Sequence, residues 1–221
     1  MGIRSNRLIE LYPYVYHMAE EGTWESIRTR GLLSTSALLD LYGIDGDARF
    51  AIESQQRPQH VVLEHAVYGT ALIRDQKVLR EGPLSKCLID MTCQQWYELL
   101  NRKVFFWLTK ERLIGLLSGK EYRNRTHCVL TIPTARLLGE YEERIRLSPI
   151  NSGSTIYKAQ PRGSETFRSL NDYPFEERRR KRGIANAIAE LCIDYSVPDI
   201  SELVTRVSHM LGPREVEVIH Q

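Results

Sequence analysis

The residues of this sequence that are best suited to chemistry lie far apart along the chain: His17, an aromatic run at Val104–Trp107, and Glu190. Glu190 lies inside an apolar stretch that is typical of a β-strand. An ionised carboxylate is costly to bury without partners, so Glu190 either faces solvent or occupies a pocket that requires a charged group. These patterns leave both interpretations open, and a solvated strand face is the simpler one.

His17 follows a strand-like run at Tyr14–Tyr16 and precedes a predicted helix over residues 24–30 that ends at Gly31. A lone histidine after an aromatic residue is most often a packed side chain. Its role therefore depends on which other groups the fold brings beside it.

The aromatic run is strongly strand-like and leads directly into a helix that Thr109 can cap. Successive side chains of a strand point to opposite faces, so Phe106 points away from Phe105 and Trp107. Core packing is the expected role of Phe105 and of at least one neighbour. The remaining face is suited to lining a cleft and stacking on a planar ring.

The elements that must position these residues are predicted from periodicity and capping patterns. Strands are expected at residues 14–16, 60–63, 104–108, 128–132, 144–147, 188–197 and 215–220, and helices at 24–30, 37–43, 48–55, 93–103, 110–119, 135–141, 175–188 and from Asp199 or Ser201. Residues 64–91 are predicted to be a long, partly ordered connection. Helices and strands alternate irregularly, which favours an α+β fold over a doubly wound sheet.

The composition indicates one globular domain over residues 1–221, with 42% apolar residues, 26% charged residues and a net charge of +2. It argues against a disordered chain and against a surface that coats nucleic acid along its whole length. No apolar run reaches the roughly 20 residues of a membrane span, and no secretory signal is recognised. Four cysteines without CxxC spacing argue against a zinc site and favour a reduced, cytoplasmic setting. No P-loop, Rossmann, GxSxG, HExxH or kinase motif is found.

Three segments together resemble the ADP-ribosyltransferase superfamily, and one of them is the aromatic strand with its capped helix, which resembles the strand whose aromatic residue stacks on nicotinamide. Tyr16-His17-Met18 is followed by a helix and by Ile27-Arg28-Thr29-Arg30-Gly31-Leu32, as in the histidine-bearing branch. The segment Ala189–Ile193 with the turn Val197-Pro198 is similar to DarT-type DNA ADP-ribosyltransferase toxins, where the catalytic glutamate lies in such a strand. Most of the chain also resembles an uncharacterised bacterial family that carries YHM-GLLSTSALLDL, VFFWLT-ERL and SPINSGST blocks.

The resemblance implies an ADP-ribosyltransferase-like α+β domain with two small packed β-sheets and flanking helices, and NAD as the cofactor. It implies Glu190 as the catalytic carboxylate and His17 as the group that holds the ribose hydroxyls. The remaining cofactor contacts that it implies are Ser34 or Thr35 at the pyrophosphate, Phe106 or Trp107 on nicotinamide, and Lys110 or Arg112 at a phosphate. The toxins have a Tyr-Phe strand followed by an arginine, whereas this chain has Phe-Phe-Trp, and its segment between His17 and Phe105 is unusually long.

The acceptor suggested by the resemblance is a nucleic-acid base, modified by a toxin or defence effector that could require an antitoxin partner. The densest charge run, Arg178, Arg179, Arg180, Lys181 and Arg182, could hold a polyanion, although a solvated face is its commoner meaning. Two alternatives stay open: a catalytically silent nucleotide or nucleic-acid sensor, and another NAD-consuming or 2′-phosphate-processing enzyme. The sequence also leaves open the oligomeric state and whether Glu165 replaces Glu190 as the key carboxylate.

Overall fold

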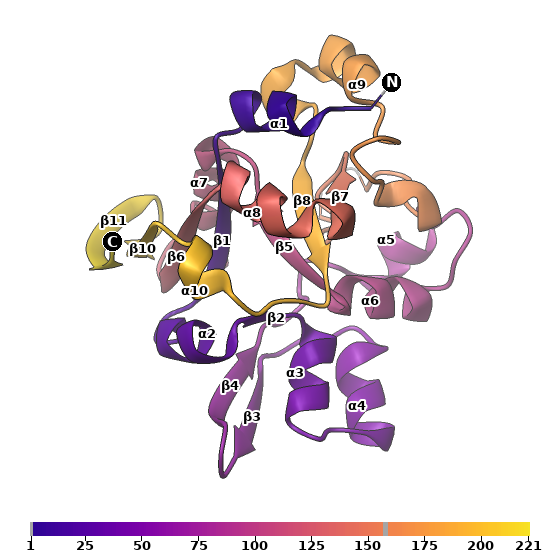
Figure 1. The fold of residues 1–221 in the computed structure, drawn as a ribbon. Coiled ribbons are helices and arrows are strands. Elements are labelled where there is room, and N and C mark those ends of the chain that lie inside the picture. Colours follow the sequence, from indigo (N-terminus) through magenta and orange to yellow (C-terminus); the bar gives the residue numbers. More distant parts are fainter. Residues whose placement is uncertain (1, 157–158) are drawn as a thin grey trace.

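The computed structural model describes residues 2–156 and 159–221, which form a mixed α+β fold (Figure 1). Its main feature is a seven-stranded antiparallel sheet in the order β11-β10-β6-β1-β5-β8-β7. The strands of this sheet are β1 (Tyr14–Glu20), β5 (Lys103–Trp107), β6 (Thr126–Pro133), β7 (Ile145–Ser148), β8 (Glu190–Asp194), β10 (Arg206–Leu211) and β11 (Arg214–His220). Two further sheets have two strands each: β2 (Leu32–Leu33) with β9 (Ser196–Val197), and β3 (Val61–His65) with β4 (Gly69–Ile73).

The large sheet consists of two halves that meet at a single residue pair. β1 pairs with β6 over its whole length, from Tyr14 to Glu20, but it pairs with β5 only through Tyr16 and Trp107. On the other side of this junction, β5 pairs with β8 from Lys103 to Trp107. β1 and β5 therefore diverge beyond the Tyr16–Trp107 pair. The backbone N–H and C=O groups on their facing edges no longer form hydrogen bonds with each other there and need other partners.

Helices cover both faces of the sheet. The main core joins the sheet to α1 (Ser5–Leu11), α2 (Trp24–Arg30), α8 (Thr134–Tyr141), α9 (Phe175–Arg182) and α10 (Ile200–Leu203). On the opposite face, α7 (Lys110–Leu117) buries Leu113 and Leu117 against Met18 and Val129. The short α5 (Glu81–Ser85) packs with α6 (Cys93–Asn101) around Trp96, whose ring stacks on Phe167.

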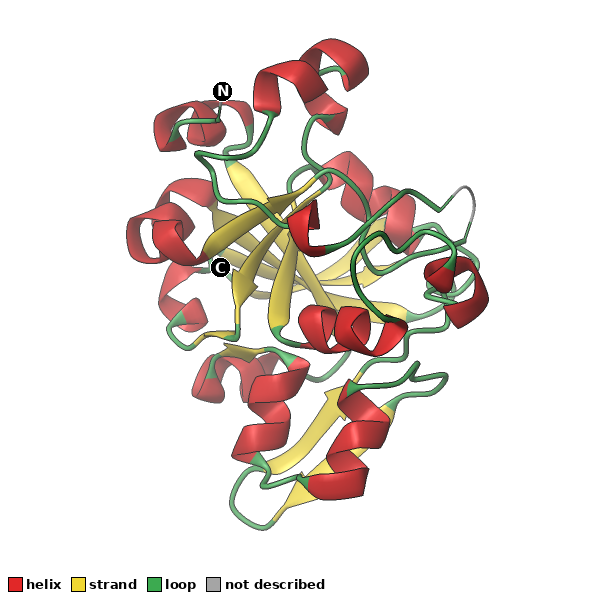
Figure 2. Ribbon diagram, turned by 90° about the vertical axis from the view of Figure 1, so that its right-hand side faces the viewer, coloured by secondary structure: helices red, strands yellow, loops and turns green. Residues whose placement is uncertain are grey.

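A small lobe projects from the sheet and carries its own apolar cluster (Figures 1 and 2). It consists of α3 (Thr35–Leu41), α4 (Gly46–Glu53) and the β3–β4 hairpin. Leu39 and Tyr42 pack there against Leu63, Ala71 and Ile73 of the hairpin. Only one face of this hairpin is apolar and buried, as expected for an antiparallel pair with a solvated side.

The predicted α+β class is confirmed, and so are most of the predicted helices and strands. Other expectations are wrong. Residues 64–91 contain the end of β3, all of β4 and α5 rather than a partly ordered connection, and β10 was not predicted at all. The helix expected over 175–188 ends at Arg182, because Gly183 adopts a positive φ of 74°. The large sheet is continuous through the Tyr16–Trp107 pair, so the strands do not form two small packed sheets.

Candidate functional site

A cavity of about 620 Å³ opens where β1 and β5 diverge. His17–Glu20 line it from β1, and Lys103–Trp107 line it from β5. The lobe closes one side through Thr70–Ile73, and the loop Asn151–Gly153 lies beside Glu190 on the other. This volume is in the range of pockets that hold small molecules and cofactors. His17, Ser34, Thr35, Phe106, Trp107 and Glu190, all singled out in the sequence, line this one cavity.

Glu190 is buried at the start of β8 and is only 5% exposed. It lies opposite Trp107 on β5 and opposite Ser148 on β7, so three strands fix its direction. The backbone N–H of Ser152 donates to its Oε2 at 3.1 Å. The solvated strand face is therefore the wrong interpretation, because Glu190, Leu191, Cys192 and Ile193 are all buried.

Burial raises the pKa of Glu190 to about 7, although hydrogen bonding from Ser152 and the positive charges of Arg112 and Arg162 oppose this rise. Desolvation disfavours the charged form of a carboxyl group, and this effect is larger than the opposing ones together. A carboxyl group with a pKa near neutrality is suited to giving and taking protons at physiological pH.

His17 satisfies a backbone group that the diverging strands leave unpaired. Its Nδ1 lies 2.9 Å from the carbonyl oxygen of Phe105, which can only accept a hydrogen bond, so Nδ1 carries the proton. Burial lowers the pKa of His17 to about 4, which keeps the ring neutral at physiological pH. In this tautomer Nε2 is an acceptor, suited to a hydroxyl group.

The two aromatic residues proposed to stack on a ligand differ in exposure. Phe106 is only 1% exposed and packs in the main core, with its ring at 5.8 Å from His17 in an edge-to-face arrangement. Trp107 is half-buried and shares its face of the sheet with Tyr16 and Glu190. Trp107 is thus the better placed of the two to offer a ring face to a ligand.

Ser34 and Thr35 lie at the start of α3, on the rim between the lobe and β2. The Ser34 hydroxyl accepts a hydrogen bond from the backbone N–H of Ala37 at 3.2 Å and so serves as the helix cap. Thr35 lines the cavity and is half-buried. Of the two, Thr35 has the hydroxyl that is not used as a cap.

The two basic residues of α7 do not line the cavity. Lys110 is exposed at the first position of the helix. Arg112 donates to the carbonyl of Ala185 at 3.3 Å and to Oδ1 of Asn186 at 2.9 Å. Its charge still lowers the pKa of Glu190, so it acts on the site without forming its wall.

The opposite end of the cavity carries a buried carboxylate, Glu20, which is paired with a half-buried and an exposed arginine. Glu20, at the end of β1, lies 3.0 Å from Nε of Arg74 and 2.7 Å from Nη2 of Arg125. The Arg74 guanidinium also lies over the ring of Tyr122, 5.3 Å from its centroid. Glu20 lies three positions along the strand from His17, a distance of about 10 Å. One end of the cavity thus carries aromatic rings and the carboxyl group of Glu190, and the other end carries the ion-paired carboxylate of Glu20.

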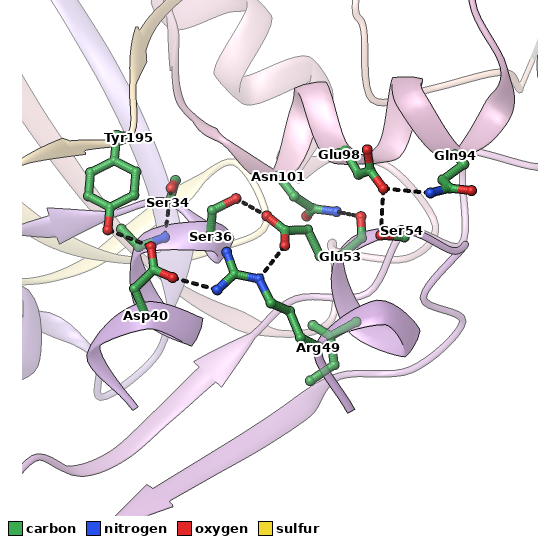
Figure 3. Close-up of polar contacts among 12 residues, drawn as sticks. Ser34, Ser36, Asp40, Arg49, Glu53, Ser54, Gln94, Glu98, Asn101 and Tyr195 are labelled. Carbon is green, nitrogen blue, oxygen red and sulfur yellow. Dashed lines mark hydrogen bonds and ion pairs between the residues drawn. The ribbon is translucent and has the colours of Figure 1, made fainter. Parts of the chain in front are cut away.

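The small lobe is held together and fastened to the body by polar contacts, some buried and some exposed (Figure 3). Glu53 accepts from Ser36 and from Nε of Arg49, and the backbone carbonyl of Glu53 accepts from Asn101 of α6 at 2.8 Å. Asp40 accepts from Arg49 and from the hydroxyl of Tyr195, which follows β8. The lobe wall of the cavity is therefore tied both to α6 and to the strand that carries Glu190.

The basic run lies on α9, and none of its residues lines the cavity. Arg179 pairs with Glu176 at 2.8 Å, Lys181 pairs with Glu177 at 2.7 Å, and Arg178 donates to the carbonyl of Pro149 at 2.8 Å. Arg180 donates to the carbonyl of Glu176, and Arg182 is exposed. Two of these five positive charges are therefore offset by ion pairs within the helix.

Glu165, the competing carboxylate, lies outside the cavity and its side chain is 79% exposed. It pairs with Arg168 at 3.4 Å. Two residues of the same loop segment matter more than the sequence indicated: Ser152, which binds Glu190, and the buried Arg162. No local pattern marks them, because their positions depend on a Ser/Gly-rich loop folding against distant elements.

Within residues 2–156 and 159–221, no group of three or more His, Cys, Asp and Glu side chains could hold a metal ion. The four cysteines are free thiols, and Cys128 and Cys192 are buried. No helix of the described chain is long and apolar enough to cross a membrane.

The fold and the site thus define a mixed α+β protein with a ligand-sized cavity between two diverging strands of its sheet. The chain belongs to DUF7002, a family of unknown function whose pattern matches residues 13–204. That span includes His17, Trp107 and Glu190. No curated protein matches the chain.

Proposed function

We propose that this protein is an NAD-dependent mono-ADP-ribosyltransferase. The observation that carries the proposal is that His17, Trp107 and Glu190, which are separated by 90 and 83 positions along the chain, line one cavity of about 620 Å³. The resemblance of their segments to ADP-ribosyltransferases assigns these three types of residue to one nucleotide site.

Cleavage of the nicotinamide–ribose bond develops positive charge on the ribose. An ionised Glu190 beside that ribose would stabilise this charge. Because the pKa of Glu190 lies near neutrality, the same carboxylate could also take a proton from the acceptor group. Its fixed direction on β8, with Ser152 bound to Oε2, means that little reorganisation is needed during the reaction.

The other cavity residues supply binding and orientation. Nε2 of the neutral His17 would accept a hydrogen bond from a ribose hydroxyl, while Nδ1 stays bound to Phe105. The half-buried ring of Trp107 would stack on nicotinamide from the same face of the sheet as Glu190. Thr35, at the rim, is the hydroxyl available for the pyrophosphate.

The acceptor that we propose is a nucleic-acid base, modified by a toxin or defence effector. Arg180, Lys181 and Arg182 are exposed on α9 and could contact phosphates. Since ion pairs within α9 offset part of its charge, we expect moderate rather than tight binding of nucleic acid. An enzyme of this kind would need an antitoxin in its host.

The proposal is tested by incubating the protein with NAD and single- or double-stranded DNA or RNA. We expect nicotinamide release and an increase in the mass of the nucleic acid by one ADP-ribose, both lost in Glu190→Gln. Glu165→Gln is the matched control, because it removes an exposed carboxylate outside the cavity. Nicotinamide release that persists unchanged in Glu190→Gln would disprove the role of Glu190.

A second candidate is a catalytically silent sensor that binds a nucleotide without turnover. The pKa of about 7 favours it, because much of Glu190 is then protonated at neutral pH and carries no charge to stabilise a cation. Saturable binding of NAD, measured by calorimetry, without nicotinamide release at any pH from 6 to 9 would select this candidate.

A further inference from the structure

Arg162 is one of the largest fully buried side chains in the protein, with only 2% of its surface exposed. Its guanidinium lies over the ring of Trp96, 5.7 Å from the centroid. Nη1 donates to the carbonyl of Ser152 at 2.9 Å, and Nε donates to the carbonyl of Gln160 at 3.1 Å. Arg162 does not line the cavity. Burying a guanidinium costs free energy unless it is hydrogen-bonded, so the hydrogen bonds of Arg162 are needed to keep it inside the protein.

Ser152 connects Arg162 to Glu190. Its carbonyl oxygen accepts from Arg162, and its own N–H donates to Oε2 of Glu190 at 3.1 Å. Both backbone groups of one residue are therefore used to join the guanidinium to the carboxylate. Ser152 is itself 1% exposed, so this connection is protected from water.

The backbone of Arg162 is held on the other side. Its N–H donates to the carbonyl of Cys87 at 2.9 Å, and its carbonyl accepts from Ile89 at 3.0 Å. The next residue, Gly163, fits closely against Asp90, since a Cβ there would lie 2.1 Å from Oδ1 of Asp90. Arg162 is thus fixed to the segment around α5 and can hold Ser152 in place.

We propose that Arg162 is a positioning residue for Glu190, holding the Ser152 peptide so that its N–H points at the carboxylate. The proposal rests on the proposed function for its catalytic consequence, since Glu190 is the carboxylate assigned there. The substitution Arg162→Gln would loosen the Ser152 N–H and remove a nearby positive charge, and both changes disfavour the ionised form of Glu190.

Two other titratable groups of the described residues lie near Glu190. Arg112 contributes its charge from α7, and Cys192 lies two residues along β8, where burial keeps its thiol protonated by raising its pKa. Trp107 and Ser148, the strand partners of Glu190, do not titrate. A change at Arg162 should therefore be visible directly in the titration of Glu190.

The test is a ¹³C NMR titration of the Glu190 side-chain carboxyl, identified by its absence in Glu190→Gln. In Arg162→Gln we expect the pKa of Glu190 to rise by about one pH unit, within the range that loss of a neighbouring charge produces. In Arg162→Lys, which keeps the charge but cannot bind both carbonyls in the same geometry, we expect a smaller rise.

Arg57→Gln is the matched control. Arg57 is also a buried arginine, 6% exposed, and it donates to the carbonyls of Ile52 and Arg74; it lines the cavity, but it is not among the charges that lower the pKa of Glu190. An unchanged titration of Glu190 in Arg162→Gln, or an equal rise in Arg57→Gln, would overturn the proposal. If Arg162→Gln does not fold, the titration of Arg162→Lys decides in the same way.

Activity gives a second readout. For Arg162→Gln we expect kcat of NAD cleavage to fall roughly tenfold or more, since misplacement of a catalytic group by about 1 Å can cost 10²-fold. KM for NAD should change little, because Arg162 does not line the cavity. The NMR titration needs no NAD, so a protein that neither binds nor cleaves NAD would refute the proposed function and still report on Arg162.

Discussion

Trp107 and Glu190 face each other across β5 and β8 as a register pair, on the same face of the sheet. Trp107 is also the one residue of β5 that pairs with β1, through Tyr16. The junction between the two halves of the sheet therefore lies directly beside the buried carboxylate, and the cavity begins there.

Glu190→Gln should abolish most NAD cleavage. Removing a group that stabilises charge or transfers a proton commonly costs 10²–10⁴-fold in rate, so we expect kcat to fall by at least roughly 100-fold. The measurement is nicotinamide release by chromatography, with Glu165→Gln as the control. Equal rates in the two variants would contradict the assignment.

The same Glu190→Gln substitution should stabilise the protein at alkaline pH. Burial raises the pKa of Glu190 from its ordinary value of 4.5 to about 7, so its contribution to stability is fully present below pH 4.5 and is lost as the pH rises through 7. Above pH 7 the wild type must bury a charge that glutamine lacks. We expect a gain on the order of 2 kcal/mol at pH 8 and much less at pH 5, measured by denaturant unfolding. A gain that is independent of pH would show that Glu190 is not the titrating group.

Activity should increase with pH through about 7, because Glu190 must ionise to stabilise positive charge. His17 should not contribute to this profile, since its pKa of about 4 leaves it neutral throughout. Kinetics from pH 5.5 to 8.5, together with ¹⁵N NMR of the His17 ring, test both points. A protonated His17 ring at pH 6 would contradict the low pKa that burial gives this ring.

His17→Ala should weaken NAD binding more than it slows the chemical step. The substitution removes the acceptor Nε2 and leaves the carbonyl of Phe105 without its partner. We expect KM to rise about tenfold, equivalent to about 1.4 kcal/mol, which is typical for one lost hydrogen bond. Asparagine at this position can still donate to Phe105, so His17→Asn should retain more of the stability than His17→Ala.

Glu53→Ala should loosen the small lobe. Glu53 is 9% exposed and accepts from Ser36 and Arg49 (Figure 3), so the substitution would leave Ser36 without this partner and Arg49 with Asp40 alone. We expect a loss of about 2–3 kcal/mol in unfolding free energy, because buried polar groups would be left unsatisfied. Amide hydrogen exchange should locate the effect in α3, α4 and β3–β4. Lys181→Ala, which removes an exposed ion pair of α9, should leave stability unchanged.

Local patterns predicted much of the secondary structure because the relevant forces are local. Thr92 and Gln95 form the capping box that starts α6, and Gly31, with a φ of 86°, ends α2. β4 escaped prediction, since the hairpin buries only alternate residues and offers a weak apolar signal. β10 lies between two strands of the sheet, and its pairing with β6 and β11 is a long-range property.

The sequence by itself determined that Glu190 lies on a strand, that His17 precedes a helix that Gly31 ends, and that Trp107 lies on an aromatic strand, because periodicity and caps act over a few residues. Only the tertiary structure decided that Glu190 is buried, that β1 and β5 separate after one residue pair, and that Arg162 reaches Ser152. These relationships join segments that are distant along the chain. They depend on how the sheet and the loop pack together, and no local pattern specifies that.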